Sequence, residues 1–130
     1  MQLIIFRLND EFYAFDTEVV ENINDIMKIT KIPKAPSYIK GLINLRGNVI
    51  SLIDLKLLLN LNNSDAKSES IIILKLEEES VGALVDEVDE VIDIEKSMIE
   101  KVENKESKAI SGVININGKI ITLIDVNKLI

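Results

Sequence analysis

The sequence contains no cysteine and no histidine, and each absence removes whole classes of chemistry. Without cysteine the chain has no disulfide, no thiolate nucleophile and no cysteine-ligated metal cluster. Without histidine it lacks the usual near-neutral acid or base, the commonest zinc ligand and any phosphohistidine of its own. Glycine and proline are scarce, with 5 and 2 residues among 130, and 47% of the residues are hydrophobic. This composition is typical of a globular domain rather than of a disordered or fibrous chain.

Acidic residues outnumber basic ones, with 22 Asp and Glu against 15 Lys and Arg and a formal net charge of −7. The phosphate backbone repels such a chain, so we expect no nucleic-acid partner. The first apolar stretch, Leu3 to Phe6, is short and is followed at once by Arg7, unlike the core of a secretion signal. No apolar run approaches the roughly 18 residues of a membrane span, so we expect a cytoplasmic protein with no membrane insertion.

Short runs of Ile and Val, separated by polar turns, predict an all-β chain. The expected strands are Leu3–Leu8, Phe12–Phe15, Leu42–Leu45, Val49–Leu55, Ile71–Leu76, Val81–Val85, Gly112–Ile116 and Lys119–Val126. Two weaker strands are expected at Lys28–Ile32 and Asp86–Asp93. The segment Asp16–Ile23 is expected to form a short helix, because Asp16 and Thr17 can accept the free amide hydrogens of a first turn.

An internal repeat is the strongest pattern in the sequence. Ile39–Leu55 aligns without gaps on Ile110–Val126 at an offset of 71, and 9 of the 17 aligned positions are identical. The repeat predicts a single domain spanning 1–130, made of two barrel subdomains at about 1–60 and 71–130 that are joined by a polar loop at 60–70. A module of roughly 60 residues buries only about 60% of its unfolded surface and is marginally stable alone, so the two copies should pack together with a groove between them.

The two repeats differ in character at three polar positions: Lys40/Ser111, Arg46/Asn117 and Asn48/Lys119. Asn117-Gly118 favours a tight type I′ turn, whereas Arg46-Gly47 carries a residue that disfavours positive φ. Either the first hairpin uses another turn type, or Arg46 is retained because a partner binds it. A guanidinium suits a carboxylate or carbonyl partner, although an ion pair within the chain is an equal alternative.

Asp54 and Asp125 occupy the same position of the two repeats. Two such carboxylates could share a proton as in aspartic proteases, but Leu55 and Val126 follow them instead of the glycine turn such enzymes need. A helix-capping role explains the repetition better. The acidic residues between 86 and 93 do not match a calcium loop, and no phosphate-binding glycine loop is present. We therefore expect a binding module that is not an enzyme and needs neither metal nor cofactor.

One long ordered string resembles a known family. Ile32 to Gly47 reads IPKAPSYIKGLINLRG, and together with Val49 to Leu55 it closely resembles the signature of the CheW family. Val81 to Val88, VGALVDEV, is similar to later strands of that family. The resemblance implies a fold of two intertwined five-stranded SH3-like barrels with short helical turns. It also implies an adaptor that couples the histidine kinase CheA to the cytoplasmic tip of methyl-accepting chemoreceptors and is recruited to the inner face of the membrane through them.

The resemblance further implies two sets of contact residues. Receptor contacts in the family correspond here to Arg46, Val20, Asn22 and Ile23, and kinase contacts to Val49 with Gly41 needed nearby. The family often has an acidic residue where this chain has Asn22, which changes the polarity of one receptor contact. Two alternatives remain: a scaffold for a related kinase pathway not tied to motility, and a carboxylate enzyme that uses Asp54 and Asp125.

Overall fold

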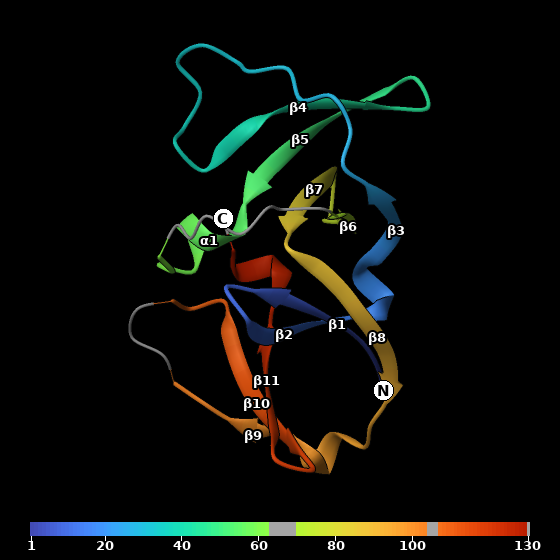
Figure 1. The fold of residues 1–130 in the computed structure, drawn as a ribbon, viewed down its shortest axis with the longest axis vertical. Helices are drawn as coiled ribbons and strands as arrows, with labels where there is room; N and C mark the ends of the chain where they lie inside the picture. The colour runs from blue at the N-terminus through green and yellow to red at the C-terminus, as the bar shows by residue number, and fades with distance from the viewer. Residues whose placement is uncertain (63–69, 104–106, 130) are drawn as a thin grey trace.

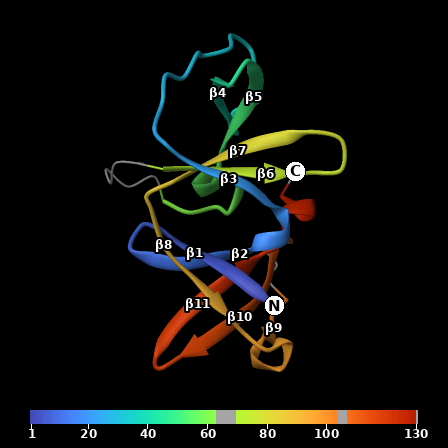
Figure 2. The ribbon, with the colours of Figure 1, turned by 90° about the vertical axis from the view of Figure 1, so that its right-hand side faces the viewer.

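The computed structural model describes residues 1–62, 70–103 and 107–129. Two strongly curled β-sheets lie one above the other along the long axis of the molecule, as Figure 1 and the perpendicular view in Figure 2 show. This arrangement is an all-β fold consistent with two SH3-like barrels. Within the described ranges, no helix is long and apolar enough to cross a membrane.

The two barrels differ in which part of the chain supplies them. The terminal barrel has the strand order β8-β1-β2-β11-β10-β9, and the central barrel has the order β3-β6-β7-β5-β4. The strands of the terminal barrel are β1 (Gln2–Leu8), β2 (Glu11–Asp16), β8 (Glu87–Asp93), β9 (Glu100–Lys101), β10 (Ile110–Ile116) and β11 (Lys119–Ile124). Those of the central barrel are β3 (Val20–Asp25), β4 (Ile39–Leu45), β5 (Asn48–Asp54), β6 (Ser70–Lys75) and β7 (Ser80–Val85). The helical turns are η1 (Thr17–Val19), α1 (Leu55–Leu58), η2 (Lys96–Met98) and η3 (Val126–Lys128).

The expected division into barrels at 1–60 and 71–130 does not follow the sheets. Strands β1 and β2 leave the first half to pair with β8 and β11, whereas β6 and β7 of the second half pair with β3 and β5. Each barrel is therefore completed by strands from the other half of the chain, and in this sense the two barrels are intertwined. Most of the expected connecting loop at 60–70 lies outside the described residues.

Strands β1 and β6 are buried on both faces and carry most of the core. In β1, Leu3 and Ile5 face the interior of the terminal barrel, while Ile4 and Phe6 face a cluster between the barrels. Strand β6 repeats this division, with its alternate residues facing the interior of the central barrel and the same junction cluster. Because side chains alternate across a strand, two-sided burial requires the continuous apolar runs seen in both strands.

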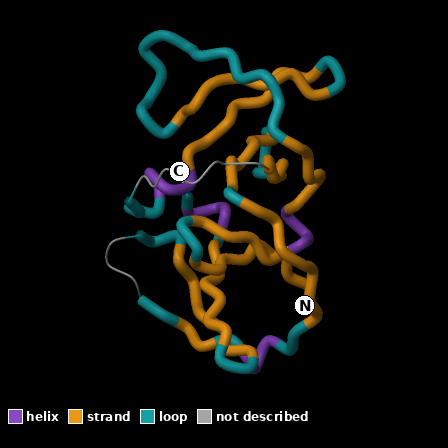
Figure 3. Tube along the Cα trace, viewed as in Figure 1, coloured by secondary structure: helices purple, strands orange, loops and turns teal. Residues whose placement is uncertain are grey.

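Nine of the ten expected strands are confirmed, with ends that move by at most a few residues. The expected strand at Lys28–Ile32 is wrong, because this segment contributes only an isolated bridge between Thr30 and Leu42. It belongs to the loop of residues 26–38, drawn in teal in Figure 3.

The expected helix at Asp16–Ile23 is also mostly wrong. Only Thr17–Val19 forms a 3₁₀ turn, which Asp16 caps by accepting a hydrogen bond from the Glu18 backbone nitrogen. Strand β3 begins at once, because pairing with the buried strand β6 stabilises an extended chain more than one further helical turn would.

Candidate functional site

The β4–β5 hairpin carries the first expected site residue at its tip. Arg46 has φ 54° and Gly47 has φ 87°, and the repeat-related Asn117 and Gly118 have φ 51° and 87°. The interpretation that the first hairpin uses another turn type is therefore wrong. Positive φ at both central residues matches a type I′ turn, which asparagine accepts more readily than arginine. Placing arginine there costs on the order of 1 kcal/mol, so local structure does not explain why this residue is arginine.

Arg46 is also exposed and available to a partner. Within residues 1–62, 70–103 and 107–129, none of the ion pairs includes it. The alternative of an ion pair within the chain therefore has no support in the described part of the molecule.

A hollow of about 380 Å³ opens beside this hairpin at one mouth of the central barrel. Its wall comes from β3, from the β4–β5 hairpin and from the start of β7. Three of the expected contact residues, Asn22, Arg46 and Val49, line it. The structure thus brings two expected receptor contacts and one expected kinase contact together.

The polar groups of this hollow are of mixed charge. Glu21 and Glu79 supply carboxylates, and the Ser80 hydroxyl donates a hydrogen bond of 2.9 Å to Glu21 Oε1. Among the described residues that line it, Arg46 has the one cationic side chain. Leu45 and the buried Ile50 add apolar surface. The hollow can therefore receive an apolar group while its rim offers a cation and two anions.

The aliphatic residues among the expected contacts differ in exposure. Val49 is 66% exposed, an unusual value for a valine, and Ile23 is 46% exposed. Val20 is half-buried and packs against the cluster between the barrels. Neither Val20 nor Ile23 lines the hollow, although both belong to β3, which forms one of its walls.

Gly41 is buried and cannot itself be a contact surface for the kinase. Its φ is +154°, and a Cβ at this position would lie 2.4 Å from the Thr30 carbonyl oxygen and 2.7 Å from Ile29 Cγ2. The expected place of Gly41 among the contacts is therefore corrected to a packing role, in which it lets the 26–38 loop approach β4. Any effect on a partner acts through the position of that strand.

Asp54 and Asp125 each cap a helical turn, which overturns the carboxylate-enzyme alternative. Asp54 Oδ1 accepts a hydrogen bond of 3.2 Å from the Leu57 nitrogen, and Asp125 Oδ1 accepts one of 3.1 Å from the Asn127 nitrogen. Asp54 also pairs with Lys40 Nζ at 3.4 Å. These contacts commit both carboxylates to local structure.

Sequence reasoning missed the side of the hollow formed by Glu21, Glu79 and Ser80. All three lie outside the 17-residue repeat, whose comparison therefore carries no information about them. Aligning the opening strands of the two halves at an offset of 68 would have identified Ser80, because that alignment pairs it with Phe12, but it pairs both glutamates with acidic residues and does not distinguish them.

Comparison with known proteins gives a consistent result. The chain matches the CheW-like domain over residues 2–130. It is 30% identical to the chemotaxis protein CheW of Thermotoga maritima, over 99% of this chain and 87% of that protein. It is 34% identical to the chemotaxis protein CheW of Bacillus subtilis, over 97% and 84% of the two chains.

A solved structure is similar over nearly the whole length. The crystal structure of the scaffolding protein TtCheW from Thermoanaerobacter tengcongensis aligns with a TM-score of 0.90 and 32% identity. The alignment covers 98% of this chain and 90% of the other. Fold, repeat and sequence agree, and the chain belongs to the CheW-like family of chemotaxis proteins.

Proposed function

We propose that this protein is a non-catalytic adaptor that couples the histidine kinase CheA to the cytoplasmic tip of methyl-accepting chemoreceptors. The observation that carries the proposal is Arg46, which is exposed and adopts a positive φ at the rim of a hollow shared with Asn22 and Val49. Membership of a family whose relatives are named chemotaxis proteins supports it. The described similarity to a scaffolding protein supports it as well.

On the receptor side, Arg46 fixes the register of the complex. Its guanidinium pairs with a carboxylate or with carbonyl oxygens on the receptor tip, a bond of about 1.5–3 kcal/mol when one partner is charged. Asn22 offers an amide that both donates and accepts. Ile23 and the exposed edge of Val20 extend the contact along β3, where apolar side chains of a helical receptor hairpin can pack.

On the kinase side, Val49 is the apolar anchor. It protrudes from β5 next to β4, which is an edge strand of the central barrel. Gly41 contributes indirectly by holding β4 close to the 26–38 loop. Val49 and Arg46 line the same hollow, so the receptor and the kinase contact adjoining surfaces of the adaptor. A movement of the bound receptor tip therefore changes the surface that the kinase contacts. Simultaneous contacts convert modest affinities into a stable array. Because its proposed receptor site is the cytoplasmic tip, the adaptor works in the cytoplasm, at the inner face of the membrane where receptors hold it.

The repeat supplies matched controls for testing this proposal. Arg46→Ala should weaken binding to a purified receptor tip about 10-fold or more, from the loss of one charge-assisted hydrogen bond, and should leave kinase binding unchanged. Asn117→Ala makes a truncation at the equivalent turn of the other barrel and should change neither. Equal receptor binding by Arg46→Ala and the parent in a sedimentation assay would contradict the receptor assignment.

The kinase surface is tested in the same way. Val49→Asp places a charge on the apolar anchor and should weaken binding to CheA more than binding to the receptor tip. Ile120→Asp is the matched control, since Ile120 is the repeat counterpart and is 52% exposed. Normal kinase co-elution of Val49→Asp, or the same loss in Ile120→Asp, would show that the site lies elsewhere. Complete failure of the parent to form a ternary complex would reject the adaptor function itself.

A further inference from the structure

The two barrels are related more closely than the 17-residue repeat indicates. In the terminal barrel Arg7 of β1 faces Phe12 of β2, and in the central barrel Lys75 of β6 faces Ser80 of β7. The parallel strand pairs give the same correspondence. Ile121 faces Phe12 in the terminal barrel. In the central barrel Ser51 faces Val81, which places Ile50, the repeat counterpart of Ile121, level with Ser80. Two independent registers thus make Phe12 the counterpart of Ser80.

Strand β8 corresponds to β3 in the same way. Glu90 faces Ile5 of β1, and Asn22 faces Ile73 of β6, with a register shift beside each pair. Asp89 and Glu90 are therefore the counterparts of Glu21 and Asn22. Together with the Lys119/Asn48 pair of the sequence repeat, these positions define the same mouth in both barrels.

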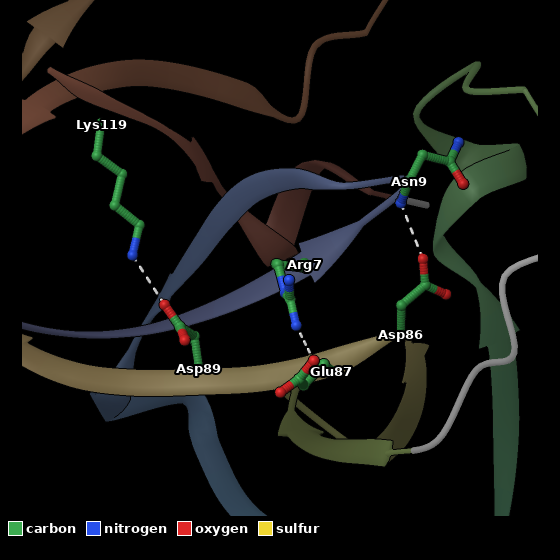
Figure 4. A network of polar contacts seen from close by, with 6 residues as sticks. All are labelled: Arg7, Asn9, Asp86, Glu87, Asp89 and Lys119. Carbon is green, nitrogen blue, oxygen red and sulfur yellow. Dashed lines mark hydrogen bonds and ion pairs between the residues drawn. The ribbon is translucent and has the colours of Figure 1, made fainter.

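In the terminal barrel this mouth is closed by the chain itself. Phe12 packs against the interior cluster of that barrel, and the Lys119 ammonium lies 3.9 Å from the centre of its ring. Lys119 Nζ is also 2.8 Å from Asp89 Oδ2 and 3.8 Å from Glu90 Oε1. Figure 4 shows Lys119 reaching from the β10–β11 hairpin to Asp89 on β8. The ring covers the interior cluster on this side, and the cation above the ring pairs with the two carboxylates.

In the central barrel three of these four groups are replaced. Serine stands where the ring is, and asparagines stand at the positions of the lysine and of Glu90. The counterparts of all four residues line the 380 Å³ hollow described above. The hollow of the central barrel therefore occupies the position that the phenyl ring of Phe12 occupies in the terminal barrel.

We propose that the hollow receives an aromatic side chain of a partner protein, whose ring takes the place over Ser80 that Phe12 takes in the other barrel. The hollow has an apolar wall on which such a ring can pack. Leu45 and Ile50 line it, and they are the repeat counterparts of Ile116 and Ile121 in the cluster on which Phe12 packs. Glu21 remains as an acceptor at the rim, as Asp89 does beside Lys119. This inference rests on the proposed function, and it assigns the ring to the receptor partner because Arg46 and Asn22 line the same hollow.

The parent protein gives the first test, with N-acetyl-L-phenylalanine amide as the probe and N-acetyl-L-leucine amide as the comparison. A ligand of this size should bind with a dissociation constant of millimolar order. We expect saturable amide chemical-shift changes at Asn22, Arg46 and Ser80, and changes at least threefold smaller for the leucine amide at equal concentration. No localised change, or an equal response to both probes, would overturn the inference. This experiment needs no variant to fold.

Closing the hollow gives the second test. The variant Ser80→Phe/Asn48→Lys recreates in the central barrel the ring and cation of the terminal barrel. It should abolish the phenylalanine-amide response and weaken receptor-tip binding at least 10-fold, while kinase binding changes less. Ser97→Phe adds a phenyl ring at an exposed position of the η2 turn and should behave as the parent.

The outcomes separate this inference from the adaptor function. A parent that binds receptor tip and kinase, together with a plugged variant that binds the receptor equally well, would overturn the aromatic site alone. A plugged variant that loses kinase but not receptor would overturn the assignment of the ring to the receptor. A parent that binds neither partner would reject the adaptor function, whatever the probes show.

Discussion

A buried ion pair at the junction of the two barrels leads to a quantitative prediction. Lys56 Nζ lies 2.9 Å from Asp86 Oδ1, and the two side chains are only 8% and 11% exposed. Asp86 follows β7 where the chain crosses to the terminal barrel, and its other oxygen accepts a 2.8 Å hydrogen bond from the Asn9 nitrogen. The pair therefore joins α1 of the central barrel to the crossover, next to the β1–β2 turn.

Lys56→Met removes the cation and keeps most of the aliphatic volume. Removing one partner of a buried pair costs about 3–5 kcal/mol, since the remaining charge stays away from water. We expect the lower end, about 3 kcal/mol, because Asp86 keeps the Asn9 hydrogen bond. For a chain of this length that loss should lower the melting temperature by about 10 °C. Urea unfolding followed by circular dichroism measures the free energy directly, and the m-value should not change.

Two further variants decide whether the reasoning is right. Lys40→Met removes a cation that is 3.4 Å from Asp54 but 41% exposed, and it should cost less than about 1 kcal/mol. Lys56→Met/Asp86→Asn removes both charges and keeps an oxygen for the Asn9 hydrogen bond, so it should recover at least half of the loss. A Lys56→Met variant no more destabilised than Lys40→Met, or a double variant less stable than the single one, would refute the stabilising role of the buried pair.

Two other predictions concern stability. Gly41→Ala should destabilise by about 3 kcal/mol in urea unfolding, because its Cβ would meet the Thr30 carbonyl at 2.4 Å. At Gly47 a Cβ would meet no atom beyond its chain neighbours within 4 Å, so only the positive φ opposes Gly47→Ala, which should cost about 1 kcal/mol. Equal losses of stability in the two variants would contradict the packing role of Gly41. Burial, with the charge and hydrogen bond of Glu11, raises the pKa of Tyr13 to about 12 from its ordinary 10. The folded state holds this proton more tightly, so its contribution is complete below pH 10 and is lost between pH 10 and 12. Tyr13→Phe should therefore lose less stability than the parent between pH 9 and 11.5, and parallel losses would contradict the assignment.

The strands could be predicted from the sequence because each carries its own signal. Runs such as Leu3–Leu8 and Ile71–Leu76 are apolar on both faces, so their strand character does not depend on knowing the neighbours. Strand β3 has no such run, and its polar and apolar residues do not separate by face: the half-buried side holds two asparagines beside Val20, and the exposed side holds Ile23 between two acidic residues. The preceding Asp16 and Thr17 indicated a helix start correctly, but nothing local indicates that the helix ends after one turn.

Strand exchange between the halves could not be predicted from residues alone. The repeat shows that two copies exist, and it is equally compatible with two separate barrels or with barrels that swap their opening strands. The choice depends on long-range pairing of β2 with β11 and of β7 with β5, which leaves no pattern within either strand. For the same reason the sequence identified Arg46 and Asn48 as departures from symmetry but not the hollow that they line.

The same contrast explains how one fold can hold two different surfaces. Core positions of the repeat match because packing constrains them: Leu52 and Leu123 are at most 5% exposed, as are Ile53 and Ile124. Rim positions such as Asn48 and Lys119 contact solvent on at least one side, so they can change without a comparable loss of stability. Divergence at the rim then leaves the architecture intact while it closes one mouth with Phe12 and Lys119 and opens the other. A partner that needs the open mouth can bind only the central barrel, which gives a nearly symmetric molecule one orientation in its assembly.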